Sequence, residues 1–428
     1  MRAVDSAGTK SPMPTIAYIA NELPNEVEWY VGDEIRELRR RGCAVIPCSA
    51  KSPDPAAVPQ RDRDLKFESL QLLPMRLGEV VAATVLCIRR AALLWDLCKR
   101  VILGREPLRR RLAALAHTIL GAAYARRLTH QRVDHIHAHH GYYASWVAMV
   151  AARLLGIPFS LTLHGSDLLV NGSYLDIKLM NCEFCRTISK FNREYILKAF
   201  PSVPPGKILM HHLGVDLPPA TVTAVREVKN QEPLRIVSIG RLHQVKNHRF
   251  LVQACSLLRD IGVALECWIV GDGPERGALS HLISELHVED NVRLVGRVPR
   301  EQAGRFCELA DLVVLTSHSE GIPLVLMEAM ARARVVLAPA ITGIPELVVD
   351  GKTGFLYPPG DLEGFVWRVD QIGRSLNALG YLRREAREHV RRHFERQWNL
   401  ERFSSAFLEQ ISRNKAVVKY EDPVLQQI

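Results

Sequence analysis

Short runs rich in β-branched residues alternate along the chain with longer segments whose apolar residues recur at helical spacing. The runs include PTIAYIA, VDHIHAHH and PFSLTLHG in the first half, and LRIVSIG, ALECWIVGDG, VRLVG, ADLVVLTS and VVLAP in the second. This alternation predicts βαβ units and parallel sheets. Between the halves lies LPPATVTAVREVKNQEP, a polar segment without periodicity that is typical of a linker.

An α/β protein of two domains is therefore expected, and 428 residues with 47% hydrophobic composition suffice to build both cores. A long amphipathic stretch begins near Asn377 and carries Phe403, Phe407 and Ile411 at helical spacing. The expected division is a polar tail over 1–13, an N-terminal domain over 14–216, a linker over 217–232, a C-terminal domain over 233–395, and a helix and tail over 396–428 that pack back on the N-terminal domain.

The net charge of +10 is concentrated in one segment, residues 76–127, where eleven Lys and Arg face three Asp and Glu. The same segment contains the apolar runs VVAATVLCI, AALLW and LAALAHTILGAAYA. The combination predicts basic amphipathic helices that could lie on an anionic membrane surface. A solvated helical insertion remains an alternative, whereas nucleic acid is not expected, because the basic residues lack interleaved aromatic side chains.

No uninterrupted apolar window of about 18 residues occurs, and the N-terminal stretch MRAVDSAGTKSPMP is polar, so we expect a cytoplasmic protein without a spanning helix or signal peptide. The nine cysteines are expected to be reduced thiols, including the C-x-x-C pair Cys182 and Cys185, which has no second pair of ligands nearby. Asp62 and Asp64 form an Asp-x-Asp between arginines in an expected loop, and no metal site is predicted.

Two cations follow the strand LRIVSIG. Arg241 and Lys246 lie at its carboxyl end, beside a glycine and before a helix, where ligands of parallel sheets bind. Such a pair can neutralise a diphosphate, Arg as a fork and Lys as a point charge. Taken alone, the same pattern also suits an ordinary structural turn.

The stretch SEGIPLVLMEAMA adds two carboxylates at the end of the strand ADLVVLTS. The chain turns at Glu320 and enters a helix that Pro323 can begin, so free N–H groups and the positive end of the helix dipole are available to an anion. Glu328 lies inside the apolar run that follows, where a carboxylate needs a partner. It could accept hydroxyl groups of a ligand or pair with Arg332 one turn later.

Histidines end two strands of the first half. His164 follows FSLTL and precedes a glycine, while His135, His137 and His139 alternate and so share one strand face. Packed, hydrogen-bonded histidines are the simpler interpretation of the alternating set. His139 and Gly141 end their strand and could still contact a ligand.

Together the stretches GRLHQVKN, VGDGP, SEGIPLVLMEAMA, GIPELVVDGKTGFLYPPGD and FERQWN resemble the retaining glycosyltransferases of glycosyltransferase family 4, in particular bacterial members that build colanic acid and related exopolysaccharides. The resemblance implies a GT-B architecture, with two facing Rossmann-like domains and a central cleft. It is strong through the C-terminal half and looser in the N-terminal half. The first loop, NELPNEVEWYVGDE, lacks the glycine-rich pattern of many members, so its role stays open.

The resemblance also implies a function: transfer of a sugar from a UDP- or GDP-sugar to a lipid-linked or other saccharide acceptor, without a cofactor or a metal. Carried over by position, the catalytic residues are Glu320, His164, Arg241 and Lys246. The donor contacts are Arg241, Lys246, Gly271, Gly273, Arg297, Val298, Glu320, Gly321, Ile322, Pro323, Leu324 and Glu328, with His139 and Gly141 on the acceptor side.

Three alternatives remain at this point. The first is an NAD-dependent oxidoreductase, because GDGPERG follows a strand and opens a helix, as a dinucleotide-binding turn does; its glycines at 271, 273 and 277, however, do not have the G-x-G-x-x-G spacing. A sugar-nucleotide epimerase of the same fold is a second alternative. A membrane-bound adaptor without activity is a third, and the intact Arg241, Lys246, Glu320 and Glu328 argue against it.

Overall fold

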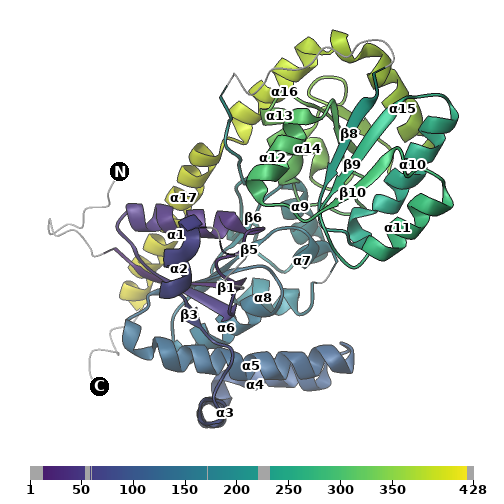
Figure 1. The fold of residues 1–428 in the computed structure, drawn as a ribbon. Coiled ribbons are helices and arrows are strands. Elements are labelled where there is room, and N and C mark those ends of the chain that lie inside the picture. Colours follow the sequence, from purple (N-terminus) through teal and green to yellow (C-terminus); the bar gives the residue numbers. More distant parts are fainter. Residues whose placement is uncertain (1–12, 54–57, 59, 171, 220–231, 422–428) are drawn as a thin grey trace. The chain divides into compact units, whose positions relative to one another are not determined.

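The computed structural model of the chain describes residues 13–53, 58, 60–170, 172–219 and 232–421. It divides into two compact units: unit 1 comprises 1–188, 193–211 and 400–428, and unit 2 comprises 189–192 and 212–399. The expected tail over 1–13 and linker over 217–232 lie outside the described residues, apart from Met13, 217–219 and Glu232. Each unit has a parallel sheet of its own (Figure 1).

Unit 1 is built on a seven-stranded parallel sheet in the order β3-β2-β1-β4-β5-β6-β7. Alternate residues of the first strand enter two different cores, Ala17 and Ile19 on one face and Ile16 and Tyr18 on the other. The strands are β1 (Thr15–Glu22), β2 (Ala44–Lys51), β3 (Leu70–Gln71), β4 (His135–His139), β5 (Phe159–Leu163), β6 (Cys185–Thr187) and β7 (Ile208–Met210).

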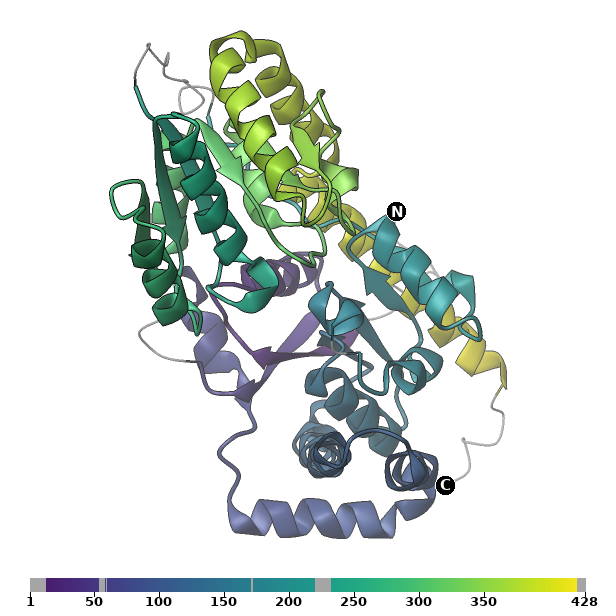
Figure 2. The same ribbon diagram turned by 90° about the vertical axis from the view of Figure 1, so that its right-hand side faces the viewer.

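Helices cover both faces of this sheet (Figure 2). One face carries α6 (Tyr143–Leu155) and α8 (Leu175–Asn181), and the other carries α1 (Trp29–Arg40) and the later part of α17 (Arg396–Glu421). Phe403, Phe407 and Ile411 of α17 are buried in the same apolar cluster as Tyr18, as their helical spacing suggests. The remaining short helices are α2 (Arg63–Glu68), α7 (Ser166–Leu169) and α9 (Lys190–Ala199), the last of which begins in unit 2.

The basic segment forms three helices, α3 (Leu77–Arg89), α4 (Ala91–Leu103) and α5 (Leu108–Leu128). The second half of α5 is anchored, since Ala122, Tyr124 and Leu128 lie in the core of unit 1. By contrast, α3 has one fully buried residue, Ala83, and runs crosswise to α4 and α5 (Figures 1 and 2). No helix in the described ranges combines the length and the apolar composition that crossing a membrane requires.

Unit 2 contains a six-stranded parallel sheet in the order β10-β9-β8-β11-β12-β13. Ile236 and Val237, adjacent on one strand, enter opposite cores, so helices pack on both faces. The strands are β8 (Leu234–Ile239), β9 (Leu265–Val270), β10 (Val292–Gly296), β11 (Leu312–Val314), β12 (Val335–Pro339) and β13 (Phe355–Tyr357). The helices are α10 (His248–Asp260), α11 (Arg276–Glu285), α12 (Arg300–Leu309), α13 (Leu324–Ala331), α14 (Ile344–Leu347), α15 (Leu362–Ser375) and α16 (Gly380–His393).

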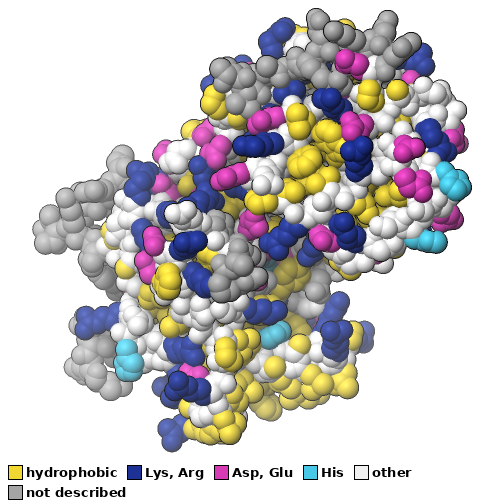
Figure 3. Space-filling model, viewed as in Figure 1, with side chains coloured by type: hydrophobic (Ala, Val, Ile, Leu, Met, Phe, Trp, Pro, Cys, Tyr) yellow, Lys and Arg dark blue, Asp and Glu magenta, His cyan; other side chains and the backbone are white. Residues whose placement is uncertain are grey.

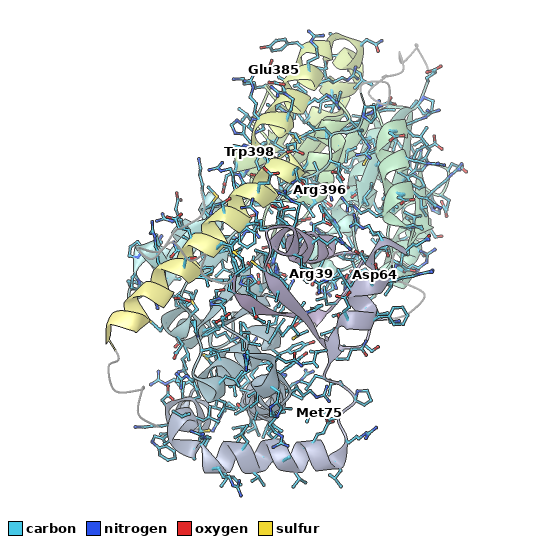
Figure 4. All side chains as sticks on the ribbon, turned by 90° about the vertical axis from the view of Figure 1, so that its left-hand side faces the viewer. Arg39, Asp64, Met75, Glu385, Arg396 and Trp398 are labelled. Atoms are coloured by element: carbon cyan, nitrogen blue, oxygen red, sulfur yellow. The ribbon has the colours of Figure 1, made fainter. Side chains whose placement is uncertain are left out.

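Three local expectations require correction. Asp62 does not lie in a loop: it ends a 3-10 turn, is buried and pairs with Arg36, and Asp64 follows within α2 (Figure 4). Pro323 is the cap residue before α13 and lies outside the helix proper. The C-terminal helical stretch is interrupted at Phe394 and Glu395, so Arg396 and Trp398 lie in the first turns of a separate helix (Figure 4).

Candidate active site

The candidate site of unit 2 lies where its strand order changes direction. β8 and β11 are neighbours, and the chain continues outward from them to opposite edges of the sheet. Loops that follow the two strands of such a switch point diverge and leave a crevice at the carboxyl edge. Arg241 and Lys246 follow β8, and Glu320 follows β11, so the topology alone brings these three residues to one edge.

Lys246 and Glu320 make a direct ion pair. The Lys246 Nζ lies 2.6 Å from Glu320 Oε1, and the Ser317 hydroxyl donates to the same oxygen at 2.6 Å. Thr342 donates to the Glu320 backbone carbonyl at 2.6 Å, which fixes the turn. Both charged side chains keep some exposure, 24% for Lys246 and 11% for Glu320. The site therefore presents one cation and one carboxylate, already oriented, at the end of two buried strands.

The amino end of α13 supplies donors beside this pair. The N–H groups of Leu324 and Val325 have no acceptor among the described residues, because the first helical hydrogen bonds run from Leu326 and Met327 to the Pro323 carbonyl. Gly343 packs against the same turn: a Cβ added there would lie 2.2 Å from the Gly321 carbonyl oxygen. The turn that begins at Glu320 is thus held closely, with its free N–H groups on a helix terminus that favours anions.

Glu328 has a partner that the sequence does not indicate. Its Oε1 accepts from the Arg300 guanidinium, at 3.0 Å from Nη2 and 3.3 Å from Nε, whereas Arg332 donates to the Glu328 backbone carbonyl at 3.1 Å. The alternative interpretation, in which the Glu328 carboxylate pairs with Arg332, is therefore wrong: the carboxylate pairs with Arg300 instead. The Glu328 side chain remains 19% exposed, and only Oε1 is used by Arg300.

Gly271 and Gly273 serve close packing of two loops. A Cβ at Gly271 would lie 2.0 Å from the Gly240 carbonyl oxygen, and one at Gly273 would lie 2.4 Å from that of Leu242. Both residues also have positive φ, +144° and +158°. The glycines that suggested a dinucleotide-binding turn are therefore required by the contact between the β8 and β9 loops.

Two basic residues with solvent-exposed side chains flank these loops. Arg241 is exposed and has no carboxylate partner among the described residues. Arg297 is also exposed and follows β10, while the next residue, Val298, packs against the apolar cluster around Val270. Arg241 is thus a cation near Gly240 whose charge no described side chain neutralises.

Unit 1 has a buried polar network at its own switch point, between β1 and β4. His139 Nδ1 lies 3.1 Å from His164 Nε2, and His139 Nε2 lies 3.0 Å from Glu34 Oε2. Glu34 also contacts the Arg186 guanidinium and the Tyr18 hydroxyl, all three fully buried. Burial alone would raise the pKa of Glu34, but Arg186 and His139 hold it well below its ordinary value, so the carboxylate is ionised.

A second carboxylate, Asp167, organises the loop around His164. It accepts from the backbone N–H groups of Gly141, His164 and Gly165 at 2.9, 3.0 and 2.7 Å. His140 lies between Asp167 and Glu28, with its Nε2 2.9 Å from Glu28 Oε1. Burial would lower the pKa of His140, yet the two carboxylates raise it to about 10. Burial and the neighbouring His140 cation lower the pKa of His164, which is therefore neutral.

The structure separates the sequence-predicted residues into two groups. Glu320, Lys246 and the start of α13 converge in unit 2, and His164 and His139 converge in unit 1. Gly141 is a packing residue, since a Cβ there would lie 2.9 Å from the Asp167 carbonyl oxygen. The sequence interpretation missed Glu34, His140, Asp167, Arg186 and Arg300, although Glu34 carried a signal: it lies among Val31, Ile35 and Leu38 on the buried face of α1.

Glu34, His137 and His139 bring ligand-type atoms within 4.8 Å of one another, as a metal site would. Those atoms already have protein partners. His137 contacts Ser160 at 2.8 Å and Thr162 at 3.0 Å, and Glu34 is taken by Arg186, Tyr18 and His139. The donor set therefore fits a hydrogen-bonded network better than a metal centre. Cys182 and Cys185 are buried free thiols, and burial raises the pKa of Cys182 to about 12.

Comparison with known proteins assigns the two halves of the chain. Residues 27–218 match the family described as Glycosyltransferase Family 4, and residues 223–389 match Glycosyl transferases group 1. The fold, the site at the switch point and these two matches define a glycosyltransferase of the GT-B group. The N-terminal half of the chain thus matches glycosyltransferase family 4 and the C-terminal half matches glycosyl transferases group 1, and the two matches confirm the resemblance seen in its motifs.

Relatives and solved structures agree with this placement. The chain is 34% identical over 201 residues to WcaL of Salmonella typhimurium, named for a glycosyltransferase of colanic acid biosynthesis, and 36% identical over 166 residues to the amylovoran biosynthesis glycosyltransferase AmsK of Erwinia amylovora. These alignments take in 45% and 37% of this chain and span about half or less of the relatives, 49% and 40%.

In three dimensions, a glycosyltransferase from Rickettsia africae superimposes with a TM-score of 0.67 over 94% of this chain and 100% of that one. Anabaena HepE in complex with UDP superimposes with a TM-score of 0.64 over 92% and 99%. Their identities of 18% and 16% establish the fold alone, and that fold confirms the expected GT-B class.

Proposed function

We propose that the protein is a retaining hexosyltransferase that moves a sugar from a UDP- or GDP-sugar to a lipid-linked saccharide during the synthesis of an exopolysaccharide. The observation that carries the proposal is the Lys246–Glu320 pair beside the free N–H groups of α13. A nucleotide sugar needs cations and N–H groups for its diphosphate and carboxylates for its hydroxyl groups. The names of WcaL, AmsK and the UDP complexes of HepE support the class of donor and of product.

Each residue of unit 2 has a role in this proposal. Lys246 and Arg241 neutralise the diphosphate, while the backbone N–H groups of Gly321, Ile322 and Leu324 donate to its oxygens; Pro323 between them has no N–H. Glu320 accepts hydrogen bonds from hydroxyl groups of the donor sugar, and Glu328 accepts hydrogen bonds from those of the ribose. Arg297 and Val298 lie near the base. Gly271 and Gly273 keep the loop after β9, which lies near the phosphates in this proposal, close to the loop after β8. Binding of ribose requires Glu328 to share its carboxylate with Arg300 or to exchange that partner.

The reaction proceeds without a protein nucleophile. The bond between the anomeric carbon and the diphosphate oxygen breaks, and the acceptor oxygen bonds to the anomeric carbon on the same face. The acceptor proton moves to the departing diphosphate, whose charge Arg241 and Lys246 stabilise. His164 contacts the donor sugar in this proposal, where a neutral imidazole or its carbonyl stabilises developing positive charge. His139 is fully buried, so we propose that His139 and Gly141 position His164 and do not contact the substrate themselves.

The acceptor explains why the protein would work at a membrane. A lipid-linked saccharide is presented at the bilayer surface, and the basic helices α3, α4 and α5 favour peripheral attachment to the anionic inner face of the cytoplasmic membrane. The domains over 14–216 and 233–395 then have acceptor-side and donor-side roles, and α17 (Arg396–Glu421) contributes residues to both units.

The test is a transfer assay with labelled UDP- and GDP-sugars and a lipid extract that contains saccharide acceptors. The proposal predicts a labelled lipid product that keeps the anomeric configuration of the donor, as measured by NMR coupling constants. Inversion would contradict the retaining mechanism. Isomerisation of the free nucleotide sugar without transfer would indicate an epimerase, and a change in nicotinamide absorbance would indicate an oxidoreductase.

A further inference from the structure

Large apolar side chains are exposed together on the helices α3, α4 and α5. Figure 3 shows hydrophobic side chains gathered at this end of unit 1, with Lys and Arg at their edges. An exposed apolar residue alone is ordinary, but a patch rimmed by cations marks an interaction surface. The most exposed members include Leu77 (79%), Ile88 (69%) and Val81 on α3, Trp95 (66%) and Leu103 (71%) on α4, and Leu108 on α5.

The spacing on α3 shows that its apolar side is continuous. Leu77, Val81 and Ile88 follow one another at intervals of four and seven residues, which places them along one side of the helix. Only Ala83 of this helix is fully buried. The helix thus presents an apolar stripe that the core of unit 1 does not cover.

A hollow of about 640 Å³ opens at the turn between α4 and α5, next to Leu103. Three cations line it, Lys99, Arg100 and Arg105, together with Asp96 and Glu106. Both carboxylates are already paired: Asp96 with Arg153 at 2.5 Å, and Glu106 with Arg110 at 3.5 Å. The lining is therefore more cationic than its composition suggests.

The cations differ in how they are held. Arg100 is fixed by Asp176 at 3.4 Å and by the Tyr174 ring, 5.5 Å from its guanidinium carbon. Lys99 and Arg105 are exposed and have no carboxylate within 4.0 Å among the described residues. One anchored cation with two unneutralised cations beside it is an arrangement suited to a phosphate group.

The turn around the hollow is a built structure. A Cβ at Gly104 would lie 2.4 Å from the Arg100 carbonyl oxygen, so the tight turn requires glycine there. Arg111 donates from Nε to the Val101 carbonyl at 2.7 Å and also contacts the Ile102 carbonyl. Arg111 therefore caps the carboxyl end of α4, and its guanidinium stabilises the turn.

We infer that this hollow binds the phosphate of a membrane lipid, while Trp95, Leu103 and the apolar stripe of α3 enter the acyl layer beside it. The partner is a bilayer that contains anionic phospholipid, chosen because exposed apolar side chains and cations without a carboxylate partner, Lys99 and Arg105, lie on the same group of helices and the loop between them. The inference deepens the proposed function and rests on it, since it names the surface that brings the site to a lipid-linked acceptor.

The experiment measures sedimentation of the full-length protein with vesicles of phosphatidylglycerol and phosphatidylcholine, compared with phosphatidylcholine alone. The double variant Lys99→Gln/Arg105→Gln should lower the partition coefficient on phosphatidylglycerol vesicles about 10-fold or more at low salt. The matched control is Arg63→Gln/Arg293→Gln, which removes the same charge from exposed residues outside α3, α4 and α5 and should change the partition coefficient less than about 3-fold. Equal losses in both variants would overturn a specific phosphate site.

Insertion has a separate readout. Lipids brominated in the acyl chain should quench part of the tryptophan fluorescence, and Trp95→Phe should remove that part. Quenching that survives in Trp95→Phe would contradict insertion of α4. Binding of soluble glycerol 3-phosphate as tight as that of vesicles would show a small-molecule site instead. Calorimetry of nucleotide-sugar binding to Lys99→Gln/Arg105→Gln and Trp95→Phe distinguishes failure of the lipid-phosphate site from failure of the proposed donor site. The affinity for the nucleotide sugar should be unchanged in these two variants, because the donor site lies in unit 2.

Discussion

The ammonium nitrogen of Lys246 lies 2.6 Å from a carboxylate oxygen of Glu320, although 74 residues separate them in the chain. The contact joins the loops after β8 and β11, the two strands at which the order of the sheet reverses. The pair holds the side chains that we assign to the donor diphosphate and the donor sugar in a defined arrangement before the substrate arrives. It is the structural centre of the proposed reaction.

Lys246 and Glu320 should therefore act as a unit. Lys246→Met should weaken nucleoside diphosphate binding by about 1.5 to 3 kcal/mol, because a charge-assisted contact is lost. Glu320→Gln should lower kcat/KM with little effect on binding of the nucleotide alone. In a double-mutant cycle on kcat/KM, the two losses should fail to add by about 1 kcal/mol or more. Strict additivity would show that the ion pair has no part in the reaction.

Glu328→Ala should weaken nucleotide binding by about 2 kcal/mol, since ribose hydroxyl groups would lose a charged acceptor. Isothermal titration calorimetry measures the loss. Glu308→Ala is the control, because Glu308 is another unit 2 carboxylate paired with an arginine, Arg332 at 3.3 Å. Unchanged affinity in Glu328→Ala, or an equal loss in Glu308→Ala, would remove the ribose role.

The Glu34–Arg186 pair should dominate the stability of unit 1. Glu34→Gln leaves a buried guanidinium without a counter-charge, and breaking such a pair costs about 3 to 5 kcal/mol of unfolding free energy. Glu37→Gln on the same helix is the control: its partners, Arg40 and Arg41, reach solvent and can be hydrated. Denaturant unfolding measures both. Equal, small losses would mean that the buried network contributes little.

The same pair orients the histidines in front of it. An ionised Glu34 requires a proton on His139 Nε2, and in the neutral ring His139 Nδ1 then accepts from His164 Nε2. On this basis we assign His164 the neutral tautomer that carries its proton on Nε2. Nitrogen-15 chemical shifts of labelled histidine should show this tautomer of His164 in the wild type and a mixture of tautomers in Glu34→Gln. The same mixture in the wild type would contradict the assignment.

His140 predicts a specific pH dependence of stability. Its pKa is raised from 6.5 to about 10 in the folded protein, so the folded state binds the proton more tightly. The stabilisation is complete below about pH 6.5 and is lost as the pH rises through about 10. The difference in unfolding free energy between the wild type and His140→Gln should therefore shrink across this range. A difference that stays constant or grows with pH would show that His140 is not held as a cation.

The sequence predicted unit 2 in detail and unit 1 in outline, for a physical reason. The unit 2 residues follow strand ends within short motifs, so Arg241, Lys246, Glu320 and the helix after Pro323 could be placed from local patterns. Arg300 could not, because its contact with Glu328 depends on how α12 packs against α13. Glu34 and Arg186 are 152 residues apart and meet only through the strand order of the sheet.

The donor site proposed in unit 2 is tested most directly by a calorimetric titration of the protein with UDP-, GDP- and ADP-sugars, repeated with Lys246→Met and Glu328→Ala. The wild type should bind a UDP- or GDP-sugar saturably, and each variant should bind it more weakly while remaining folded as judged by thermal unfolding. Failure of all three nucleotide sugars to bind the wild type, or binding that neither substitution alters, would contradict the proposed donor site.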